Sequence, residues 1–102
     1  ADFLDLCGQP LGAGDYLALA EYFHTLVLAD IPRLGPAKRD QAKRFVTLID
    51  ALYDAKVKLV CSAETGPTEL YTEGDGAFEF ERTTSRLIEM QSPDYLALNH
   101  RG

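Results

Sequence analysis

Three motifs that define common functional classes are absent from this chain of 102 residues. No apolar run approaches the roughly 20 residues that a membrane-spanning helix needs, so we expect no membrane span. The phosphate-binding pattern Gly-x-x-x-x-Gly-Lys-Ser/Thr does not occur, which predicts that the chain alone does not hydrolyse ATP. No nucleophile-elbow motif is present, so a catalytic triad is not predicted among Ser62, Ser85, His24 and Cys61.

Cysteine and histidine are scarce, with two of each. No pair among them has the spacing of zinc ligands, so the sequence predicts no metal site. Cys61 lies inside an apolar run and Cys7 lies beside two leucines. We expect both to be buried free thiols, as in a reducing compartment, and a disulfide between them stays an alternative.

Positive charge is also in short supply. Lysine and arginine total 10 against 16 acids, which gives a net charge of −6. An acidic domain does not attract nucleic-acid phosphates over its whole surface, so we expect no nucleic-acid partner. The densest basic cluster, in residues 38–44, contains Asp40 and is interpreted as the solvated start of a helix.

The stretch from Arg44 to Ser62 organises the chain. Four apolar residues in it follow helical spacing, at i, i+3, i+4 and i+7. Apolar runs at residues 26–29 and 57–61 lie on either side of this helix. Strand, helix and strand in this order predict a right-handed β-α-β crossover with two parallel strands. The chain is therefore predicted to be a single α/β domain, a small parallel sheet with flanking helices in a three-layer-like arrangement.

The other elements are placed by caps and periodicity. Residues 3–7 form a short helix or strand, and Asp15 caps a helix over 16–23. Alternation over 77–81 predicts a half-exposed strand, and Thr83 or Thr84 then caps a helix to about Gln91. The remaining expected elements are strands at 26–31 and 57–61, a central helix from 37–40 to 53–55, one helical turn at 68–71 and a Ser92-capped helix at 94–98. The predicted core is Leu28, Phe45, Leu48, Ile49, Leu52, Leu59 and Val60.

Asp30 and Ser62 stand at the carboxyl ends of the two predicted strands. Open α/β sheets place their ligands at this edge, so both are candidate phosphate-binding or partner-binding residues. The run that ends in Asp30 is similar to a Walker B strand, but Ile31 and Pro32 follow instead of a second acid. A turn or cap role for Asp30 is the alternative.

Arg82 and Arg86 form the second candidate site. They lie one helical turn apart at the predicted start of a helix, where both can bind one phosphate or carboxylate. The alternative is that Glu79, Glu81 and Glu89 neutralise them as surface ion pairs of little consequence.

Two long strings in this chain read RFxxLIDxLYD and ERTxSRLxEMQS. They resemble the C-terminal region of the ZapE-like P-loop ATPases, whose mitochondrial relatives are called AFG-one-like. The resembling segments, which span nearly the whole chain in order, are FLDLC (3–7), GDYLALAEYFHTLVLADIPRL (14–34), RFVTLIDALYDAKVKLVCSAE (44–64), ELY (69–71) and FEFERTTSRLIEMQSPDYL (78–96).

The resemblance implies an AAA-like, ATP-dependent parent protein that uses ATP and Mg²⁺. It implies that the nucleotide-binding loop lies upstream, so this chain is expected to be a C-terminal fragment without catalytic residues or a cofactor of its own. The implied partners are the remainder of the ATPase chain, neighbouring subunits or a cell-division or client protein. The implied location is cytoplasmic or membrane-peripheral.

Two other functions compete with this interpretation. The first is an independent module that binds a partner protein through a sheet edge or through the helix with Arg82 and Arg86. The second is a hydrolase that uses Ser62 or Cys61, which no motif supports.

Overall fold

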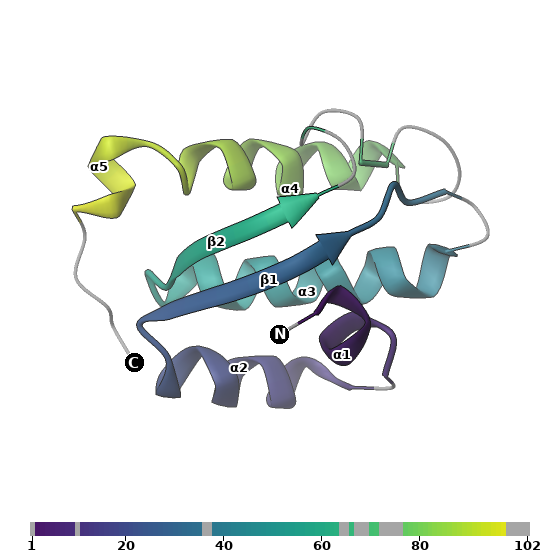
Figure 1. Cartoon of the computed structure of the whole chain (residues 1–102), viewed down its shortest axis with the longest axis horizontal. Helices are drawn as coiled ribbons and strands as arrows, with labels where there is room; N and C mark the ends of the chain where they lie inside the picture. Colours follow the sequence, from purple (N-terminus) through teal and green to yellow (C-terminus); the bar gives the residue numbers. More distant parts are fainter. Residues whose placement is uncertain are drawn as a thin grey trace.

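The computed structural model describes residues 2–9, 11–35, 38–63, 66, 70–71 and 77–97. None of the helices in this part of the chain is long and apolar enough to cross a membrane. Figure 1 shows the elements in chain order: α1 (Phe3–Cys7), α2 (Ala13–Tyr22), β1 (Thr25–Ile31), α3 (Arg39–Asp54), β2 (Lys58–Ala63), α4 (Ala77–Glu89) and α5 (Pro93–Leu96).

The predicted β-α-β unit is confirmed, and with it the α/β class. β1 and β2 form a two-stranded parallel sheet, and α3 connects them. Thr25 pairs with Lys58 and Val27 with Val60. The four stripe residues of α3 are fully buried, because their helical spacing places them all on the side of α3 that meets the core.

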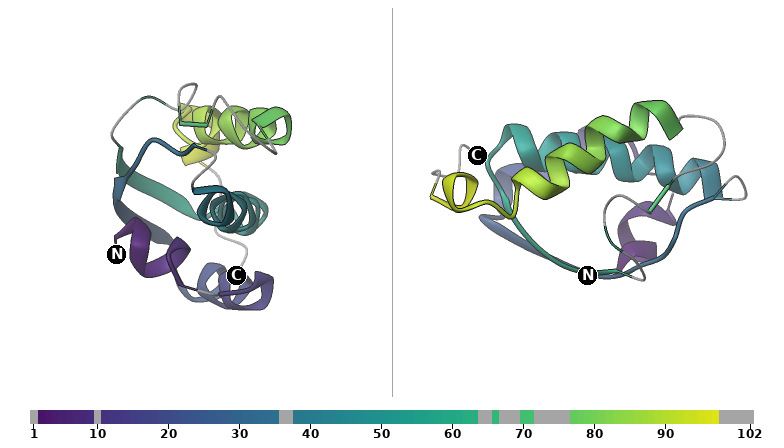
Figure 2. Two further views of the ribbon diagram at one scale, coloured as in Figure 1. Left: turned by 90° about the vertical axis from the view of Figure 1, so that its right-hand side faces the viewer. Right: turned by 90° about the horizontal axis from the view of Figure 1, so that it is seen from above.

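All the longer helices lie on one side of the sheet. Figure 2 shows α2, α3 and α4 together on one side of β1 and β2, while α1 lies near the edge of the sheet beside β1. The opposite face of the sheet carries Val27 and Val60, whose side chains are 55% and 58% exposed. A third layer on that face, as the sequence suggested, is not present among the described residues.

The core prediction was wrong for Val60 and only partly right for Leu59, which is half-buried against the core. Side chains alternate along a strand, so Val60 points away from α3. Cys61 was also expected to be buried, but it is exposed. It lies in the part of β2, from Val60 to Ala63, whose residues are all exposed. Cys7 is buried, and both thiols are free, so the disulfide alternative is ruled out.

Aromatic rings join the helices at the centre of the core. Phe45 of α3 lies 5.8 Å from Phe3 of α1 and 6.0 Å from Phe80 of α4, measured between ring centroids. Tyr71 meets the edge of Phe80 at 5.4 Å. Farther along the chain, the buried Tyr95 hydroxyl donates to the Val57 carbonyl at 2.7 Å and fixes α5 against the start of β2.

The largest error concerned residues 77–81, which are the first turns of α4 and not a strand. The alternation of two phenylalanines and acids is too short to decide between the two structures. Beyond it, Phe80, Thr83, Leu87 and Met90 are all buried at helical spacing, which favours one continuous helix. Thr83 therefore lies inside α4 and caps nothing.

The other helix boundaries need smaller corrections. α2 begins at Ala13, with Gly12 as its N-cap, and the Asp15 carboxylate accepts from the Gly12 N–H at 2.9 Å. Asp15 thus makes one half of a capping box from the third helical position, and Gly12 has no side chain to make the other half. Ser92 does cap α5, accepting from the Tyr95 N–H at 3.2 Å. Residues 3–7 are helical, and the turn expected at 68–71 falls mostly outside the described residues.

Candidate functional site

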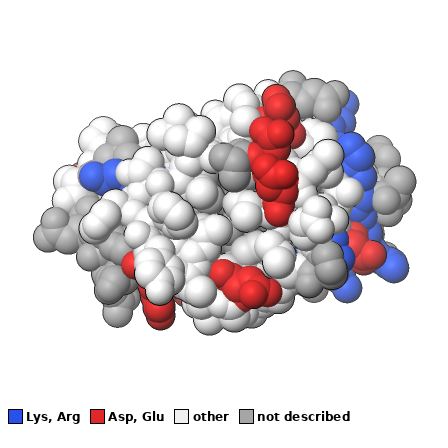
Figure 3. Space-filling model, turned by 60° about the horizontal axis from the view of Figure 1, so that its bottom comes forward, with Lys and Arg blue, Asp and Glu red and all other residues white. Residues whose placement is uncertain are grey.

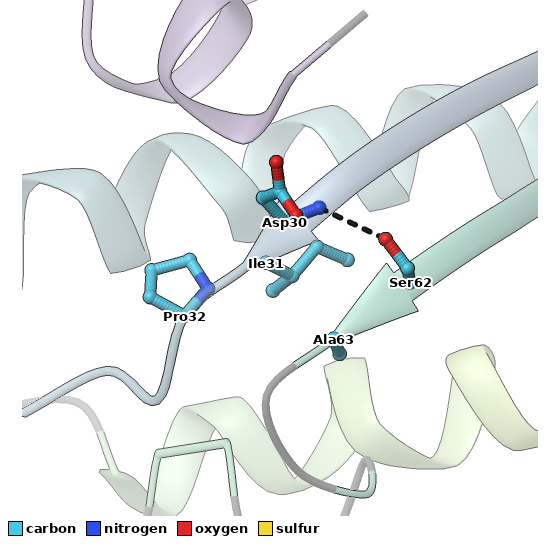
Figure 4. A pocket seen from close by; sticks show the side chains of 5 residues that line it. All are labelled: Asp30, Ile31, Pro32, Ser62 and Ala63. Atoms are coloured by element: carbon cyan, nitrogen blue, oxygen red, sulfur yellow. Dashed lines mark hydrogen bonds between the residues drawn. The ribbon is translucent and has the colours of Figure 1, made fainter.

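The two strands end at a hollow of about 310 Å³ (Figure 4). Both sequence-predicted candidates at this edge line it, together with three small or apolar residues. The five lining residues are Asp30, Ile31, Pro32, Ser62 and Ala63. The strand-end rule therefore brought together two residues that are 32 positions apart in the sequence.

A bulge in β1 shapes this hollow. Leu28 pairs with Cys61 and Ile31 with Ala63, so Ala29 and Asp30 together oppose Ser62 alone. The extra residue lets β1 bend at its end. Bulges are rare in parallel sheets and occur preferentially at sheet edges and next to active sites.

Asp30 occupies an unusual backbone conformation, with φ at 61°. Asp tolerates the left-handed region better than most residues, but such a backbone still costs on the order of 1 kcal/mol or more. The Asp30 N–H donates to the Ser62 Oγ at 3.0 Å, and this bond holds the two strand ends together. The bulge and the left-handed residue were not predictable from the apolar pattern.

The site offers a carboxylate and a hydroxyl to an incoming group. Both residues are exposed, and the Ser62 hydroxyl keeps its proton for donation because it accepts from Asp30. A carboxylate with a hydroxyl suits a hard cation or a cationic side chain and repels an unaccompanied phosphate. No cluster of three metal-ligating side chains exists among the described residues, so a cation would need ligands from elsewhere.

Arg82 and Arg86 form a separate group on α4. Since α4 begins at Ala77, they are not at a helix start, so the predicted placement at a helix N-terminus is wrong. Both guanidinium groups contact the Asp50 carboxylate of α3, Arg82 at 3.5 Å and Arg86 more closely. No pattern in the sequence singled out Asp50 as their partner, because it lies on a different helix.

The two arginines differ in their surroundings. The Arg86 side chain is 23% exposed and its guanidinium lies 4.8 Å from the centre of the Tyr53 ring. The Tyr53 hydroxyl donates to Glu89, and this hydrogen bond raises the pKa of Tyr53. The Arg82 side chain is 67% exposed. Arg86 therefore ties α4 to α3, and Arg82 remains accessible to a partner.

This difference predicts unequal effects of two matched substitutions. Arg86→Ala should lower the free energy of unfolding by about 1.5–3 kcal/mol, because it removes a partly buried, charge-assisted hydrogen bond and a cation–π contact. Arg82→Ala should cost less than about 1 kcal/mol, as exposed ion pairs do. Urea unfolding followed by circular dichroism measures both. Equal losses would show that the two arginines have the same structural role.

No hydrogen bond or ion pair joins the arginine group to Asp30 or Ser62 within the described part of the chain. The structure thus separates the four predicted site residues into two groups.

Sequence reasoning missed a hydrogen bond made by Arg44. The Arg44 guanidinium donates to the Cys7 carbonyl at 3.1 Å and so connects α3 to the end of α1.

The chain is similar in sequence to one family of known proteins. A model of the family described as AFG1-like ATPase matches residues 1–99. Cell division protein ZapE of Escherichia coli K12 is 43% identical over 98 residues, which cover 96% of this chain and 26% of that protein. Lactation elevated protein 1 homolog B of Danio rerio is 38% identical, over 91% of this chain and 25% of its own length. The chain thus spans about a quarter of the length of these curated relatives. No solved structure matches it.

Proposed function

Because the chain belongs to the AFG1-like ATPase family, we propose that it forms a domain of such an ATPase outside the nucleotide-binding loop and is not catalytic by itself. Two sequence features support this proposal. The glycine-rich phosphate-binding loop is absent from all 102 residues. The Walker-B-like run ends in one acid, Asp30, and continues with Ile31 and Pro32.

Within this ATPase, the function of the domain is to present Asp30 and Ser62 to the Mg²⁺-bound phosphates of a nucleotide held by the remainder of the protein. The observation that carries this proposal is the bulge, which holds Asp30 at a φ of 61° and bonds it to Ser62 at the strand ends. Strained backbone of this kind persists where the surrounding structure requires it, and it concentrates at ligand-binding sites.

Charge decides which part of the nucleotide complex the site contacts. The chain carries a net charge of −6, and Asp30 adds a local negative charge, so a bare phosphate is repelled. Mg²⁺ usually binds one or two carboxylates and completes its shell with phosphate oxygens and water. Asp30 supplies such a carboxylate, and Ser62 supplies a hydroxyl ligand or a hydrogen bond to bound water.

Asp30→Asn in the longer ATPase tests this role. It keeps the shape and removes the charge, and we expect the ATPase rate to fall at least about tenfold, as loss of groups that support a metal does. Mn²⁺ affinity of the nucleotide-bound ATPase, measured by electron paramagnetic resonance, should weaken in parallel. Unchanged rate and unchanged Mn²⁺ affinity would overturn the assignment of the site.

Two controls accompany this substitution. Glu21→Gln removes one charge from an exposed position in the last turn of α2. This end of α2 lies opposite the carboxyl ends of the strands, so rate and affinity should stay unchanged (Figure 1). A calorimetric titration of the isolated chain with MgATP should show no tight binding. Tight binding there would contradict the non-catalytic assignment itself, independently of the result for Asp30.

A second candidate function is protein binding through α4. The observation that favours it is the 67% exposure of the Arg82 side chain, which meets Asp50 only at 3.5 Å. An acidic side chain of a partner would compete with Asp50 for this guanidinium. The E. coli relative is named as a cell division protein, so a cytoplasmic cell-division or client protein is the class of partner to test against Arg82→Ala.

A further inference from the structure

One backbone pairing lies on the edge of β1 opposite β2 and is not part of the two-stranded sheet. Asp2 forms an isolated parallel bridge with Ala29, just before α1 begins. The Lys58 N–H donates to the His24 carbonyl, so His24, Leu26 and Leu28 direct their backbone groups toward β2. By alternation, Thr25, Val27 and Ala29 direct theirs toward the opposite edge, where Asp2 lies.

Because this bridge is parallel, it predicts the direction and the register of a further strand beside β1. In a parallel pair both chains advance together, so residues that precede Asp2 lie beside residues that precede Ala29. Counting back two positions from both partners places Val27 opposite the residue immediately before Ala1. Counting back four positions places Thr25, at the start of β1, opposite the third residue before Ala1.

The exposed surface also indicates that the sheet is incomplete. Purely parallel sheets occur almost only with both faces covered, and two strands alone are marginal in water. Here Val27 and Val60 face outward in register. Figure 3 shows a largely uncharged surface on the side that includes part of this face, interrupted by acidic groups, with the basic groups visible in this view mainly at one end. A further strand paired with β1 would enlarge this two-stranded sheet, which is marginal by itself.

We propose that the segment preceding Ala1 in the longer protein forms a third parallel strand on the outer edge of β1, so that β1 becomes the central strand. The occupant is thus part of the same polypeptide. The E. coli relative supports a longer polypeptide, because this chain covers only 26% of it. The proposal rests on the proposed function only in that the chain belongs to a longer ATPase. The strand would lead directly into α1, which gives a second β-α-β unit before α3.

A disulfide tests the register directly. In the longer protein with Cys61→Ala, Val27→Cys is combined with a cysteine placed immediately before Ala1. Neighbouring strands lie about 4.8 Å apart, which is within the Cα separation that a disulfide bridges, about 4.4–6.8 Å. We expect a cross-link within one chain after mild oxidation, detected by mass spectrometry of peptides. Val27 is exposed, so this substitution should not disturb folding.

The matched control moves the second cysteine one residue earlier. Successive side chains on a strand point to opposite faces, so this pair should cross-link at least about tenfold less. Equal yields for both pairs, or no cross-link in either, would overturn the proposal. A cross-link that forms only between two chains would also overturn it, because the occupant would then be a second copy. The ATPase and Mn²⁺ results for Asp30→Asn do not depend on this outcome.

Discussion

Replacement of Phe45 by alanine should lower the free energy of unfolding by about 3–5 kcal/mol, the usual cost of removing a buried ring from a core. Phe45 is fully buried. Its ring contacts Phe3 and Phe80, so it connects three helices that are far apart in the sequence. Small domains are stable by only about 5–15 kcal/mol, so this variant should lie close to the unfolding threshold.

Two further substitutions keep this test informative if Phe45→Ala does not fold. Phe45→Leu retains most of the apolar volume and should lose roughly 1–2 kcal/mol less than the alanine variant. Val60→Ala, on the open face of the sheet, should change stability by no more than about 0.5 kcal/mol in the isolated chain. Urea midpoints provide the comparison. A Val60 effect as large as that of Phe45 would mean that the open face is buried.

The sequence predicted the centre of the fold correctly because the centre depends on periodicity. The α3 stripe has the helical period, and the flanking runs at 26–29 and 57–61 have the length and composition of buried strands. A helix between two such strands leaves few topologies, and the parallel crossover is one of them. The same reasoning located Asp30 and Ser62 at a shared edge, because parallel strands end on the same side.

Apolar periodicity did not predict the structure where a strand pattern and a helix pattern overlapped. It also did not predict contacts between side chains of different elements. Phe80 fits an alternating strand when only 77–81 is read, and it fits a helix once Leu87 and Met90 are included. The partner of the two arginines, Asp50, lies 32 and 36 residues away on α3, beyond the reach of any local pattern. The open sheet face and the bulge at Asp30 likewise depend on tertiary packing.

Three buried groups should make the stability of this chain sensitive to alkaline pH. Burial raises the pKa of Cys7 from 9.0 to about 12. Burial also raises the pKa of Tyr16 from 10.0 to about 12, and a neighbouring Cys7 charge adds to the effect. Burial raises the pKa of Tyr95 from 10.0 to about 12. Two of these groups are tied to the backbone, because the tyrosine hydroxyls donate to the Leu6 and Val57 carbonyls, each at 2.7 Å.

The sign of the pH dependence follows from which state loses its protons first. Between pH 9 and 12 the unfolded chain releases these three protons, while the folded chain retains them. The unfolded state then binds fewer protons, so the free energy of unfolding falls as pH rises. The stabilisation is complete below pH 9 and is lost progressively as pH approaches about 12. Each unit of pKa difference corresponds to about 1.4 kcal/mol, so a loss of several kcal/mol is expected.

Urea unfolding of the wild type and Tyr95→Phe at pH 8 and at pH 11 measures this dependence. At pH 8 the variant should be less stable by about 1–2 kcal/mol, because the buried Val57 carbonyl loses its hydrogen bond. Between pH 8 and 11 the variant should lose about 1 kcal/mol less than the wild type, since one of the three titrating groups is gone. A wild-type stability that stays constant to pH 11 would contradict the burial of these groups. Identical losses in the two proteins would show that Tyr95 does not titrate with folding.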